Sequence, residues 1–574
     1  GIPIVLVIAG LAAVSLVAQY GFYLSEQQQR VLRVADMVIV AFFMLDAIIR
    51  FALSRRKTRY LKARWPAVAI VGLILSQLFL VSLLQGRGWL PQVLARPDVF
   101  SLAKGYIIVL QVYLVFLIIA EAVRANRRIA STRIAPARTV MLSFILVIVV
   151  GALLLATPRA TVTGHISPVD ALFSATSAVC VTGLIVVDTG SYFTRFGHGV
   201  ILMLIQIGGL GLITFATFFA TTLRGGLGVK ESLMLRGMMT FETIGRIGRT
   251  LRHVIGITFL FEATGAALLF AATRMDFRTA GQAARSSIFH AVSAFCNAGL
   301  SLNASSFERY VGNVPVNLVM TTLIVVGGLG FPVLIAFFRS RGERAGGRLA
   351  VRKWTLHVRL VLVMTAILLV IGTVSFLVLE WDGTLAGRSF AGKLMASYFG
   401  SVTARTAGFN TVRTAALALP TLFVLATLMF IGGSPAGTAG GVKTVTIGLV
   451  LASIRSMFKG TSRVEFFRRR VPDWLAREAL VVVAVGILVV SGGTLVLLIT
   501  EDLPLSKVLF EVVSAFGTVG LSTGITPTLS VTGKVVLMLI MLTGRIGPLT
   551  LALSLVQSGQ KALYDYPEER VIIG

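Results

Sequence analysis

The stretch HAVSAFCNAGLSLN, residues 290–303, is the part of the sequence that best indicates the fold. An apolar run of helical character ends at Cys296 and Asn297, and a glycine and small polar residues follow it. The chain around this stretch consists largely of Leu, Val, Ile and Phe. Neither a globular core nor a simple membrane anchor needs a polar turn at the end of an apolar helix. The turn is therefore a candidate functional feature.

The composition places the chain among integral membrane proteins. It has 574 residues, of which 56% are hydrophobic and 13% charged, and its mean hydropathy is +0.88. A helix needs roughly 20 mainly apolar residues to cross a bilayer, and runs of that length predict about twelve spans. Clear examples occupy residues 3–23, 32–53, 66–85, 105–123, 139–157, 254–273, 360–380 and 480–500.

The net charge of +29 is concentrated in a few short segments between the spans. This distribution favours membrane topology over a nucleic-acid partner, because Lys and Arg collect in cytoplasmic loops. The basic segments alternate with poorly charged ones, so we expect both termini in the cytoplasm and the protein in the cytoplasmic (inner) membrane. The basic segments are residues 55–64, 124–138, 224–252, 339–359 and 455–477.

Four stretches of the chain repeat one pattern. Each has a short apolar run, a turn rich in Ser or Thr, one glycine and small or hydroxylated residues. Their glycines stand 116, 109 and 112 residues apart, which indicates an internal repeat. The four stretches are DALFSATSAVCVTGLIV (170–186), FHAVSAFCNAGLSLN (289–303), LMASYFGSVTARTAGFNTV (394–412) and LFEVVSAFGTVGLSTG (509–524).

The short apolar run of each repeat predicts a re-entrant pore helix, because it is too short to cross a bilayer. In HISPVDALFSA, Ser167 can cap the helix, Pro168 suits its first position and Asp170 falls in its first turn. Irregular backbone at membrane depth is tolerated only where it is buried in protein or lines a water-filled path. Four such loops around one axis would surround a pore with carbonyl oxygens, which can replace the hydration shell of a cation. The polar turns therefore predict a selectivity filter.

The predicted fold class is an all-α integral membrane protein. Four helix–pore loop–helix repeats surround one central pore in pseudo-fourfold symmetry, and about four extra transmembrane helices precede them. The predicted boundaries are 1–125 for the N-terminal extension, 136–225, 250–340, 357–458 and 476–560 for the four repeats, and 561–574 for a C-terminal tail.

From residue 136 onward the sequence resembles the Trk/Ktr/HKT superfamily of potassium transporters, most closely the KtrB-type (TrkH-like) membrane subunit. The resemblance implies potassium uptake through a single-chain, channel-like pore. The motifs that carry it, beyond the four repeats, are QIGGLG (206–211), GGLGFPV (327–333), GGSPAGTAGGVKT (432–444), GRIGPLT (544–550) and YPEERVIIG (566–574).

Carried over residue by residue, the resemblance implies a filter of four walls, each with one glycine. In this superfamily a Ser in place of the first glycine accompanies sodium transport in some plant members, so glycine in all four walls implies potassium. No wall has the full Thr-Val-Gly-Tyr-Gly of a potassium channel, so a sodium-selective or non-selective monovalent cation transporter of the same fold stays open. The implied filter residues are Val181, Thr182, Gly183 and Leu184; Asn297, Ala298, Gly299 and Leu300; Thr406, Ala407, Gly408 and Phe409; and Thr518, Val519, Gly520 and Leu521.

The last span of the third repeat is interrupted by glycines and Pro435. Gly and Pro at this density break a helix, and the resemblance implies an intramembrane gate loop, with a plain kink as the alternative. Arg545 is a charge in mid-span; the resemblance directs it at the gate loop, and pairing with an acid is the alternative. The implied gate residues are Gly432, Gly433, Gly437, Gly440, Gly441, Lys443 and Arg545.

Four other residues near the predicted pore are expected to be structural. Glu262 in mid-span would be satisfied by amides of a neighbouring pore helix, and His290 would pack in its own pore helix. Cys180 and Cys296 are expected to be small buried residues without redox chemistry, and two cysteines imply no disulfide framework.

The N-terminal extension, residues 1–125, faintly resembles a voltage sensor around Asp46 and Arg50. A sensor would need Arg at every third position of its fourth span, where only Lys104 and Glu121 occur before the basic end. A packing or dimer-supporting role is the preferred interpretation.

The remaining expectations concern partners and chemistry. The resemblance implies a homodimer in membrane lipid, regulated by a separate cytoplasmic ring of RCK-type (KtrA/TrkA-like) subunits that hold the nucleotide. We expect no organic cofactor in this chain, with K⁺ as the transported ion. An enzyme acting on lipids would need clustered His, Asp, Glu or Cys, and five scattered His argue against it.

Overall fold

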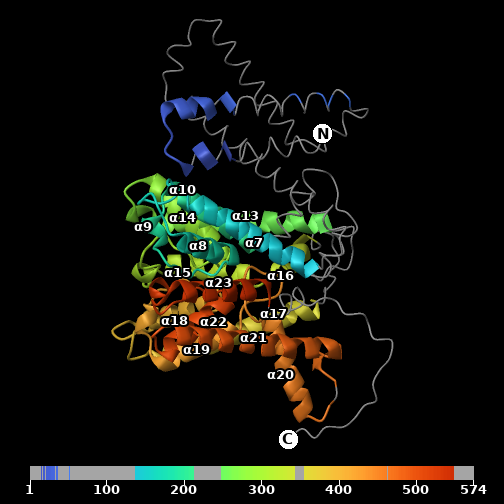
Figure 1. Cartoon of the computed structure of the whole chain (residues 1–574). Helices are drawn as coiled ribbons and strands as arrows, with labels where there is room; N and C mark the ends of the chain where they lie inside the picture. The colour runs from blue at the N-terminus through green and yellow to red at the C-terminus, as the bar shows by residue number, and fades with distance from the viewer. Residues whose placement is uncertain are drawn as a thin grey trace.

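The computed structural model describes residues 136–211, 247–342, 354–461 and 463–547, and scattered positions between residues 14 and 53 (Figure 1). Most of the predicted N-terminal extension, including Asp46, Arg50 and Lys104, lies outside the described residues. The predicted C-terminal tail, 561–574, lies outside them as well. The boundaries of the extension and of the repeats stay predictions.

The regular secondary structure of the described residues is helical apart from one short hairpin between α20 and α21 (Figure 1), so the predicted all-α fold is confirmed. The helices are α7 (Pro136–Leu155), α8 (Pro168–Cys180), α9 (Thr189–Tyr192), α10 (Arg195–Leu210), α13 (Ile247–Thr273), η2 (Arg274–Asp276), α14 (Ala280–Phe295), η3 (Glu308–Tyr310), α15 (Val314–Gly328), α16 (Phe331–Gly342), α17 (Leu356–Leu379), α18 (Phe390–Ala404), η5 (Thr414–Ala416), α19 (Leu419–Phe430), α20 (Thr444–Phe458), α21 (Asp473–Thr500), α22 (Leu505–Gly517), η6 (Thr526–Thr528) and α23 (Val531–Ile546). The antiparallel hairpin pairs β1 (Glu465–Phe466) with β2 (Arg469–Arg470).

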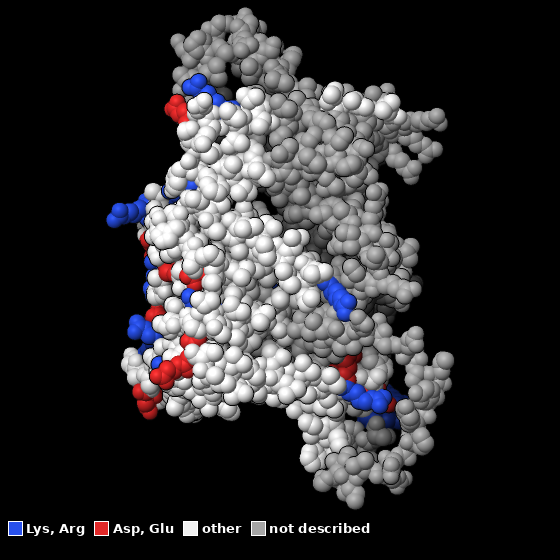
Figure 2. Space-filling model, in the orientation of Figure 1, with Lys and Arg blue, Asp and Glu red and all other residues white. Residues whose placement is uncertain are grey.

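Apolar helices and an apolar surface mark the molecule as a membrane protein. Among the described residues, three helices are long and apolar enough to span a bilayer: His253–Asp276, Leu356–Leu379 and Asp473–Thr500. Helices α15 and α16 pass the same test as one span bent by 102°. Figure 2 shows a broad uncharged face, with charged side chains at the edge where the loops beside α9 and α18 lie. The prediction of about twelve spans extends into residues that are not described.

Short helices occupy all four positions at which pore helices were predicted, and we call these helices, α8, α14, α18 and α22, the pore helices. Ser167 caps α8, since its side chain accepts a hydrogen bond from the Asp170 amide at 3.1 Å and Pro168 stands in the first turn. Thr279 caps α14 and Ser389 caps α18 in the same way. These caps satisfy backbone donors that a helix start leaves unpaired. Each helix then ends at one of the four predicted glycine turns.

The helices that follow these turns also stop where glycines occur. Helix α10 ends before Gly211 and α23 ends before Gly547, and both glycines have positive φ angles, 79° and 95°. Helix α15 ends at Gly328, and Gly330 (φ 88°) precedes α16. The bend between α15 and α16 was not predicted from the sequence.

Three glycines let these second helices approach the pore helices closely. A Cβ atom on any of them would collide with a carbonyl oxygen of the neighbouring pore helix, so only glycine allows the approach. The pairs are Gly208 with Val179, Gly327 with Phe295, and Gly544 with Phe516. This packing holds the ends of α8, α14 and α22 against α10, α15 and α23.

Candidate functional site

The backbone of the four glycine turns is unusual in the same way each time. We call residues 181–184, 297–300, 406–409 and 518–521 the first to fourth glycine loops. Each has two left-handed residues, the glycine and the residue two positions before it, and a non-glycine residue in that conformation costs about 1–2 kcal/mol. The φ angles are 57° and 92° (Val181, Gly183), 59° and 68° (Asn297, Gly299), 73° and 78° (Thr406, Gly408), and 51° and 92° (Thr518, Gly520).

The four glycine loops form a closed ring in chain order. A Cβ atom on Gly183 would lie 2.6 Å from the Ala298 oxygen, and one on Gly299 would lie 2.9 Å from the Ala407 oxygen. In the same way, a Cβ atom on Gly408 would collide with the Val519 oxygen, and one on Gly520 would collide with the Thr182 oxygen, which closes the ring. Each glycine therefore faces the carbonyl that precedes the next glycine, and the structure brings all four predicted loops together.

The amides of the ring are bonded to the pore helices behind it. In the first, second and fourth loops, the residue before the glycine donates its N–H to a serine carbonyl. In the third loop, the corresponding residue donates to the Thr403 carbonyl at 2.9 Å. The oxygens of these same four residues accept no hydrogen bond from the described part of the chain. At these four residues, therefore, the amide is bonded to the pore helix and the carbonyl oxygen is left available to a ligand. The serine bonds are Thr182 to Ser177 (2.8 Å), Ala298 to Ser293 (2.7 Å) and Val519 to Ser514 (2.8 Å).

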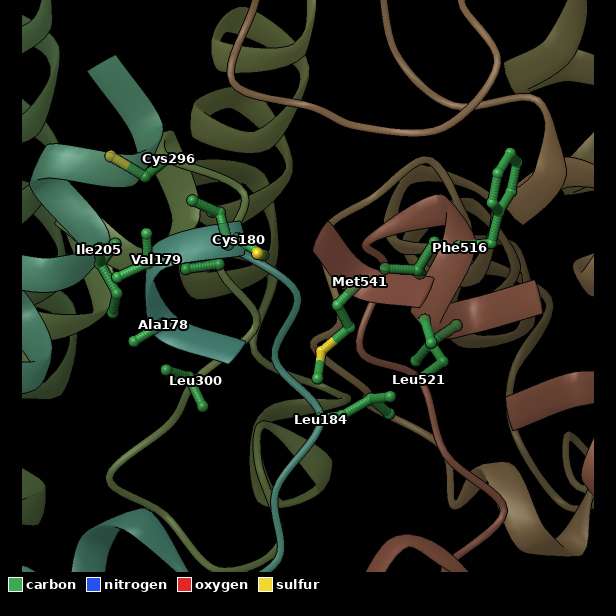
Figure 3. Close-up of a cluster of buried hydrophobic side chains, with 14 of the residues drawn as sticks. Ala178, Val179, Cys180, Leu184, Ile205, Cys296, Leu300, Phe516, Leu521 and Met541 are labelled. Atoms are coloured by element: carbon green, nitrogen blue, oxygen red, sulfur yellow. The ribbon is translucent and has the colours of Figure 1, made fainter. Parts of the chain in front are cut away.

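The side chains that follow the glycines are packed into the core. Leu184 and Phe409 are fully buried, and Leu300 and Leu521 are 4% and 3% exposed. Figure 3 shows Leu184, Leu300 and Leu521 with Cys180 and Cys296 among apolar residues of α8, α10, α22 and α23. Backbone atoms rather than these side chains therefore line the ring. Both cysteines are free and buried.

A long non-helical segment interrupts the third repeat between α19 and α20. We call residues 431–443 the intramembrane loop. Its two ends pair with each other, since Gly432 donates to the Val442 oxygen at 2.9 Å and Val442 donates to the Phe430 oxygen at 3.2 Å. A plain kink would keep the helix going, whereas here the helix stops and restarts. The loop contains all five predicted gate glycines and Lys443.

The intramembrane loop is bonded to the bend between α15 and α16. Ser434 donates its amide to the Gly328 oxygen at 3.0 Å. In the reverse direction the Phe331 amide donates to the Ala436 oxygen at 3.0 Å. Gly330 approaches Pro435 so closely that a Cβ atom would lie 2.5 Å from its oxygen. The bend and the loop are therefore one hydrogen-bonded unit.

Arg545 of α23 joins three elements. Its guanidinium donates to the Thr438 oxygen in the intramembrane loop and to the Gly208 oxygen at the end of α10. Within the described ranges no carboxylate lies at ion-pair distance from Arg545, so pairing with an acid is not observed there. Lys443 donates to the Ala439 oxygen at 2.7 Å. Both predicted cations therefore bond carbonyls of this loop.

Glu262 of α13 is buried, with 4% exposed, and its partners differ in part from those expected. The side-chain amide of Gln206 donates to one oxygen at 3.3 Å, and the Cys296 thiol donates to the other at 3.7 Å. The amide thus comes from α10 rather than from a pore helix. Gln206 stands in the QIGGLG motif, but nothing in its spacing identifies Glu262 as its partner. Among the described residues no cluster of His, Cys, Asp and Glu could hold a metal ion.

Sequence reasoning also missed contacts that join neighbouring loops away from the ring. Lys534 of α23 forms an ion pair with Asp170 of α8 at 2.7 Å, which joins the fourth and first pore elements. Asn410, just after the third glycine loop, donates to Glu308 at 2.9 Å, which joins the third and second. The partners of each pair are far apart in the sequence, and no local pattern signals them.

A ring of carbonyl oxygens within a bundle of apolar helices is an arrangement found in membrane proteins that conduct cations. The chain belongs to the TrkH family of cation transport proteins, because the family described as "TrkH: Cation transport protein" matches residues 108–564. The resemblance found in the sequence is therefore confirmed.

The matches to known relatives cover nearly the whole length of those relatives. Ktr system potassium uptake protein B of Bacillus subtilis is 39% identical over 77% of this chain and 97% of its own length. Potassium/sodium uptake protein NtpJ of Enterococcus hirae is 35% identical over 77% of this chain and 98% of its own. This chain also matches the crystal structure of the potassium transporter TrkH from Vibrio parahaemolyticus, with a TM-score of 0.58 at 18% identity. The match covers 91% of this chain and 97% of the TrkH chain, so the two proteins share the fold.

Proposed function

We propose that the protein takes up K⁺ across the cytoplasmic membrane through a pore whose selectivity filter is the ring of four glycine loops. The closed ring of carbonyl oxygens, in which the amide of the residue before each glycine is bonded to the pore helix behind it, carries this proposal. Such oxygens can replace the water around a cation. The names of two relatives support potassium as the substrate class: a Ktr system potassium uptake protein and a potassium/sodium uptake protein.

The pore helices add an electrostatic preference to the filter. Helices α8, α14, α18 and α22 all end at the ring, and the C-terminal end of a helix carries a partial negative charge. Four such ends around one axis favour a cation and disfavour an anion. The backbone strain in each loop is held by the pore-helix bonds, so the carbonyls stay in place when an ion leaves.

In this proposal the intramembrane loop is the gate. It is glycine-rich and follows the third pore element, and Arg545 bonds its carbonyl at Thr438. Breaking the Arg545 contacts frees the loop to move aside. Helix α16 provides a lever, since its first amide is bonded to the loop and its far end leads toward the basic segment 339–359.

A cytoplasmic regulator fits this arrangement. The relatives named as parts of a Ktr system imply more than one component. We propose that this chain forms a homodimer with both termini in the cytoplasm and that an RCK-type ring, which holds the nucleotide, acts on its basic inner face. Such a ring would pull on helices such as α16 and so change the position of the gate.

Rubidium uptake into proteoliposomes, with K⁺ and Na⁺ as competitors, tests the transport proposal. We expect K⁺ to block uptake and Na⁺ to leave it nearly unchanged. Gly183→Ser should weaken that discrimination, because its Cβ atom would lie 2.6 Å from the Ala298 oxygen and Gly183 has a φ of 92°. If the protein conducts no cation with or without a regulatory ring, the transport assignment is wrong.

A sodium-selective or non-selective transporter is the second candidate, favoured by the relative named for both ions and by the lack of a full Thr-Val-Gly-Tyr-Gly in any loop. The same uptake assay separates the candidates. Equal block by Na⁺ and K⁺ would identify a non-selective pore. Stronger block by Na⁺ would identify a sodium transporter.

A further inference from the structure

Two opposite walls of the ring are supported by side chains at the same position of their pore helices. Glu511 of α22 stands nine residues before Gly520, and His290 of α14 stands nine residues before Gly299. The ring runs through the loops in chain order, so the second and fourth loops face each other across the axis. The two side chains therefore occupy equivalent places behind opposite walls.

Glu511 is fully buried and surrounded by hydroxyl donors. Ser522, two residues after the filter glycine, donates to its two oxygens at 2.8 and 3.1 Å. Thr526 of η6 donates to the same carboxylate. Burial opposes the ionised form of this carboxyl group, whereas the hydroxyl donors to its two oxygens favour that form. Glu511 makes no ion pair with a Lys or Arg of the described ranges, so a cation bound in the ring is the opposite charge that would favour its ionised form.

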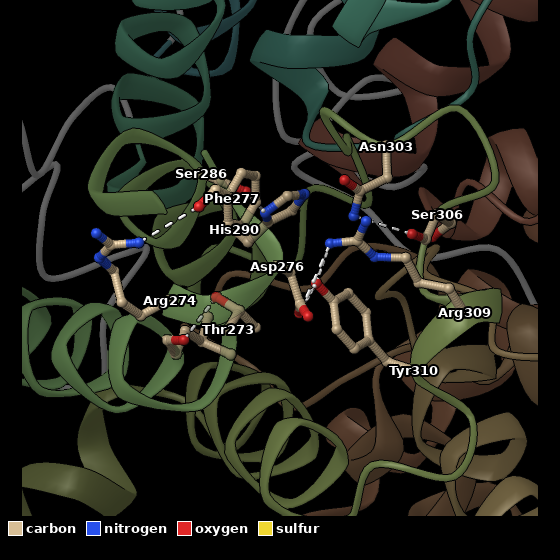
Figure 4. A network of polar contacts seen from close by, with 11 residues as sticks. Thr273, Arg274, Asp276, Phe277, Ser286, His290, Asn303, Ser306, Arg309 and Tyr310 are labelled. Carbon is tan, nitrogen blue, oxygen red and sulfur yellow. Dashed lines mark hydrogen bonds and ion pairs between the residues drawn. The ribbon is translucent and has the colours of Figure 1, made fainter. Parts of the chain in front are cut away.

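His290 makes the corresponding contacts as a neutral ring. The Leu302 amide lies 3.2 Å from Nε2, and since an amide can only donate, Nε2 has no proton. The proton is then on Nδ1, which faces the Ser286 hydroxyl at 3.1 Å (Figure 4). Ser301, two residues after the filter glycine, lies 3.0 Å from Nε2. His290 thus holds its loop without a charge.

The loops beyond these side chains are also built alike. In the second loop the Asn303 amide donates to Ser301 Oγ at 3.0 Å, and in the fourth the Gly524 amide donates to Ser522 Oγ at 2.8 Å. Each serine is therefore held between a pore-helix side chain and an amide four residues after the glycine. The two frames match in geometry and differ in charge.

Building on the proposed transport function, we propose that Glu511 is a positioning residue whose charge sets the affinity of the filter for its ion. Its charge, held behind the fourth wall, raises the affinity of the filter for monovalent cations, while His290 braces the second wall without contributing charge. A unit charge about 10 Å from an ion, at an effective dielectric constant near 20, changes the affinity for that ion by roughly tenfold. One charge on one side of the pore is enough for such an effect.

The test compares Glu511→Gln with His290→Gln and with Glu501→Gln in full-length protein in proteoliposomes. Glu501 is a matched control, because it also accepts bonds from a serine of the fourth repeat, Ser530, at 3.2 Å and lies outside the pore helix. The readouts are the Rb⁺ concentration for half-maximal uptake and the melting temperature of the purified protein. We expect Glu511→Gln to raise the half-maximal concentration roughly three- to tenfold, and the other two variants to change it less than about twofold, given that neither changes a buried charge.

Two results would overturn the inference. A half-maximal concentration for Glu511→Gln equal to that of the parent would show that the charge does not reach the ion. An equal rise in Glu511→Gln and His290→Gln, with equal losses of melting temperature, would show that bracing alone matters. If Glu511→Gln fails to fold, Glu511→Asp, which keeps the charge, is compared with Glu511→Ala, which removes it. Glu511→Asp is expected to keep the parent affinity. An increase in its half-maximal Rb⁺ concentration as large as that of Glu511→Ala would also reject the role of charge. These results all presuppose Rb⁺ uptake by the parent, whose absence would reject the transport function itself.

Discussion

The ring of glycine loops and the intramembrane loop both contain glycines, are non-helical and are mostly buried in the protein, yet they are held in different ways. The ring bonds mainly to its own pore helices, for example through Ser177 and Ser514. The ends of the intramembrane loop pair with each other, and its middle bonds to other elements, through Gly328, Phe331 and Arg545. A segment held by its own helix moves only with that helix, whereas one held by its neighbours can be released. This difference is what the proposed roles of the two segments, a fixed filter and a movable gate, require.

The largest effect is expected from Gly520→Ala, which attacks the fixed ring. Its Cβ atom would lie 2.8 Å from the Gly183 Cα, and Gly520 has a φ of 92°. Because both the collision and the left-handed conformation oppose a side chain, K⁺ over Na⁺ discrimination in Rb⁺ uptake should fall about tenfold or more. Gly256→Ala in α13 is the control, since nothing lies within 4 Å of its Cβ position. Unchanged discrimination in Gly520→Ala would mean that the ring is not the filter.

The next effect is expected from Arg545→Ala, which attacks the releasable loop. The change removes charge-assisted bonds to Thr438 and Gly208, each worth roughly 1.5–3 kcal/mol. Uptake without a regulatory partner should therefore rise about tenfold, with K⁺ over Na⁺ discrimination kept. Rubidium flux in proteoliposomes measures both. Loss of discrimination with no gain in flux would place Arg545 with the ring instead.

A smaller effect is expected from Lys534→Met, which weakens a link between the first and fourth pore elements. Lys534 and Asp170 are 14% and 22% exposed and lie 2.7 Å apart. An ion pair of this exposure contributes up to about 1 kcal/mol, so the melting temperature should drop by a few degrees and less so at high salt. Ion discrimination should stay at the parent value, since the ring bonds are untouched. A drop in discrimination would show that the ring depends on its periphery.

The smallest effect is a pH dependence from Glu380 at the end of α17. Burial raises the pKa of this carboxyl, but hydrogen bonds from Ala418 and Thr384 outweigh it and hold the pKa below its ordinary value. A lowered pKa in the folded state gives stability that is present above the unfolded pKa and is lost as the pH falls through the folded pKa. Melting temperatures from pH 6 down to about pH 3 should therefore fall less steeply in Glu380→Gln than in the parent. Parallel curves would contradict this account.

The repeat pattern predicted the local features of the ring well. The spacing of Gly183, Gly299, Gly408 and Gly520 identified four equivalent turns, and Ser167 was recognised as a cap, since both signals lie within one short segment. The break at residues 431–443 was visible because its five glycines interrupt a span. That these residues act as filter and gate stays a proposal.

Contacts between repeats could not be predicted, because they depend on the cyclic order of the loops in space. The bond of the Phe331 amide to Ala436, the ion pair of Asp170 with Lys534 and the approach of Gln206 to Glu262 all join distant parts of the chain. The common role of His290 and Glu511 was hidden for the same reason. That both residues stand nine positions before a glycine becomes informative only once the structure shows that the four glycine loops form one ring.

The closure of the ring has a consequence for biosynthesis. Gly520 meets the Thr182 oxygen, so the last loop to leave the ribosome completes a wall begun by the first. Contacts between such distant segments form late, because the chain entropy of the intervening residues must be lost first. A chain that is still being made thus contains three loops and no finished ring. If the ring is the proposed filter, its ion path exists only once synthesis of the fourth repeat is complete, and no selective pore forms in the membrane before then.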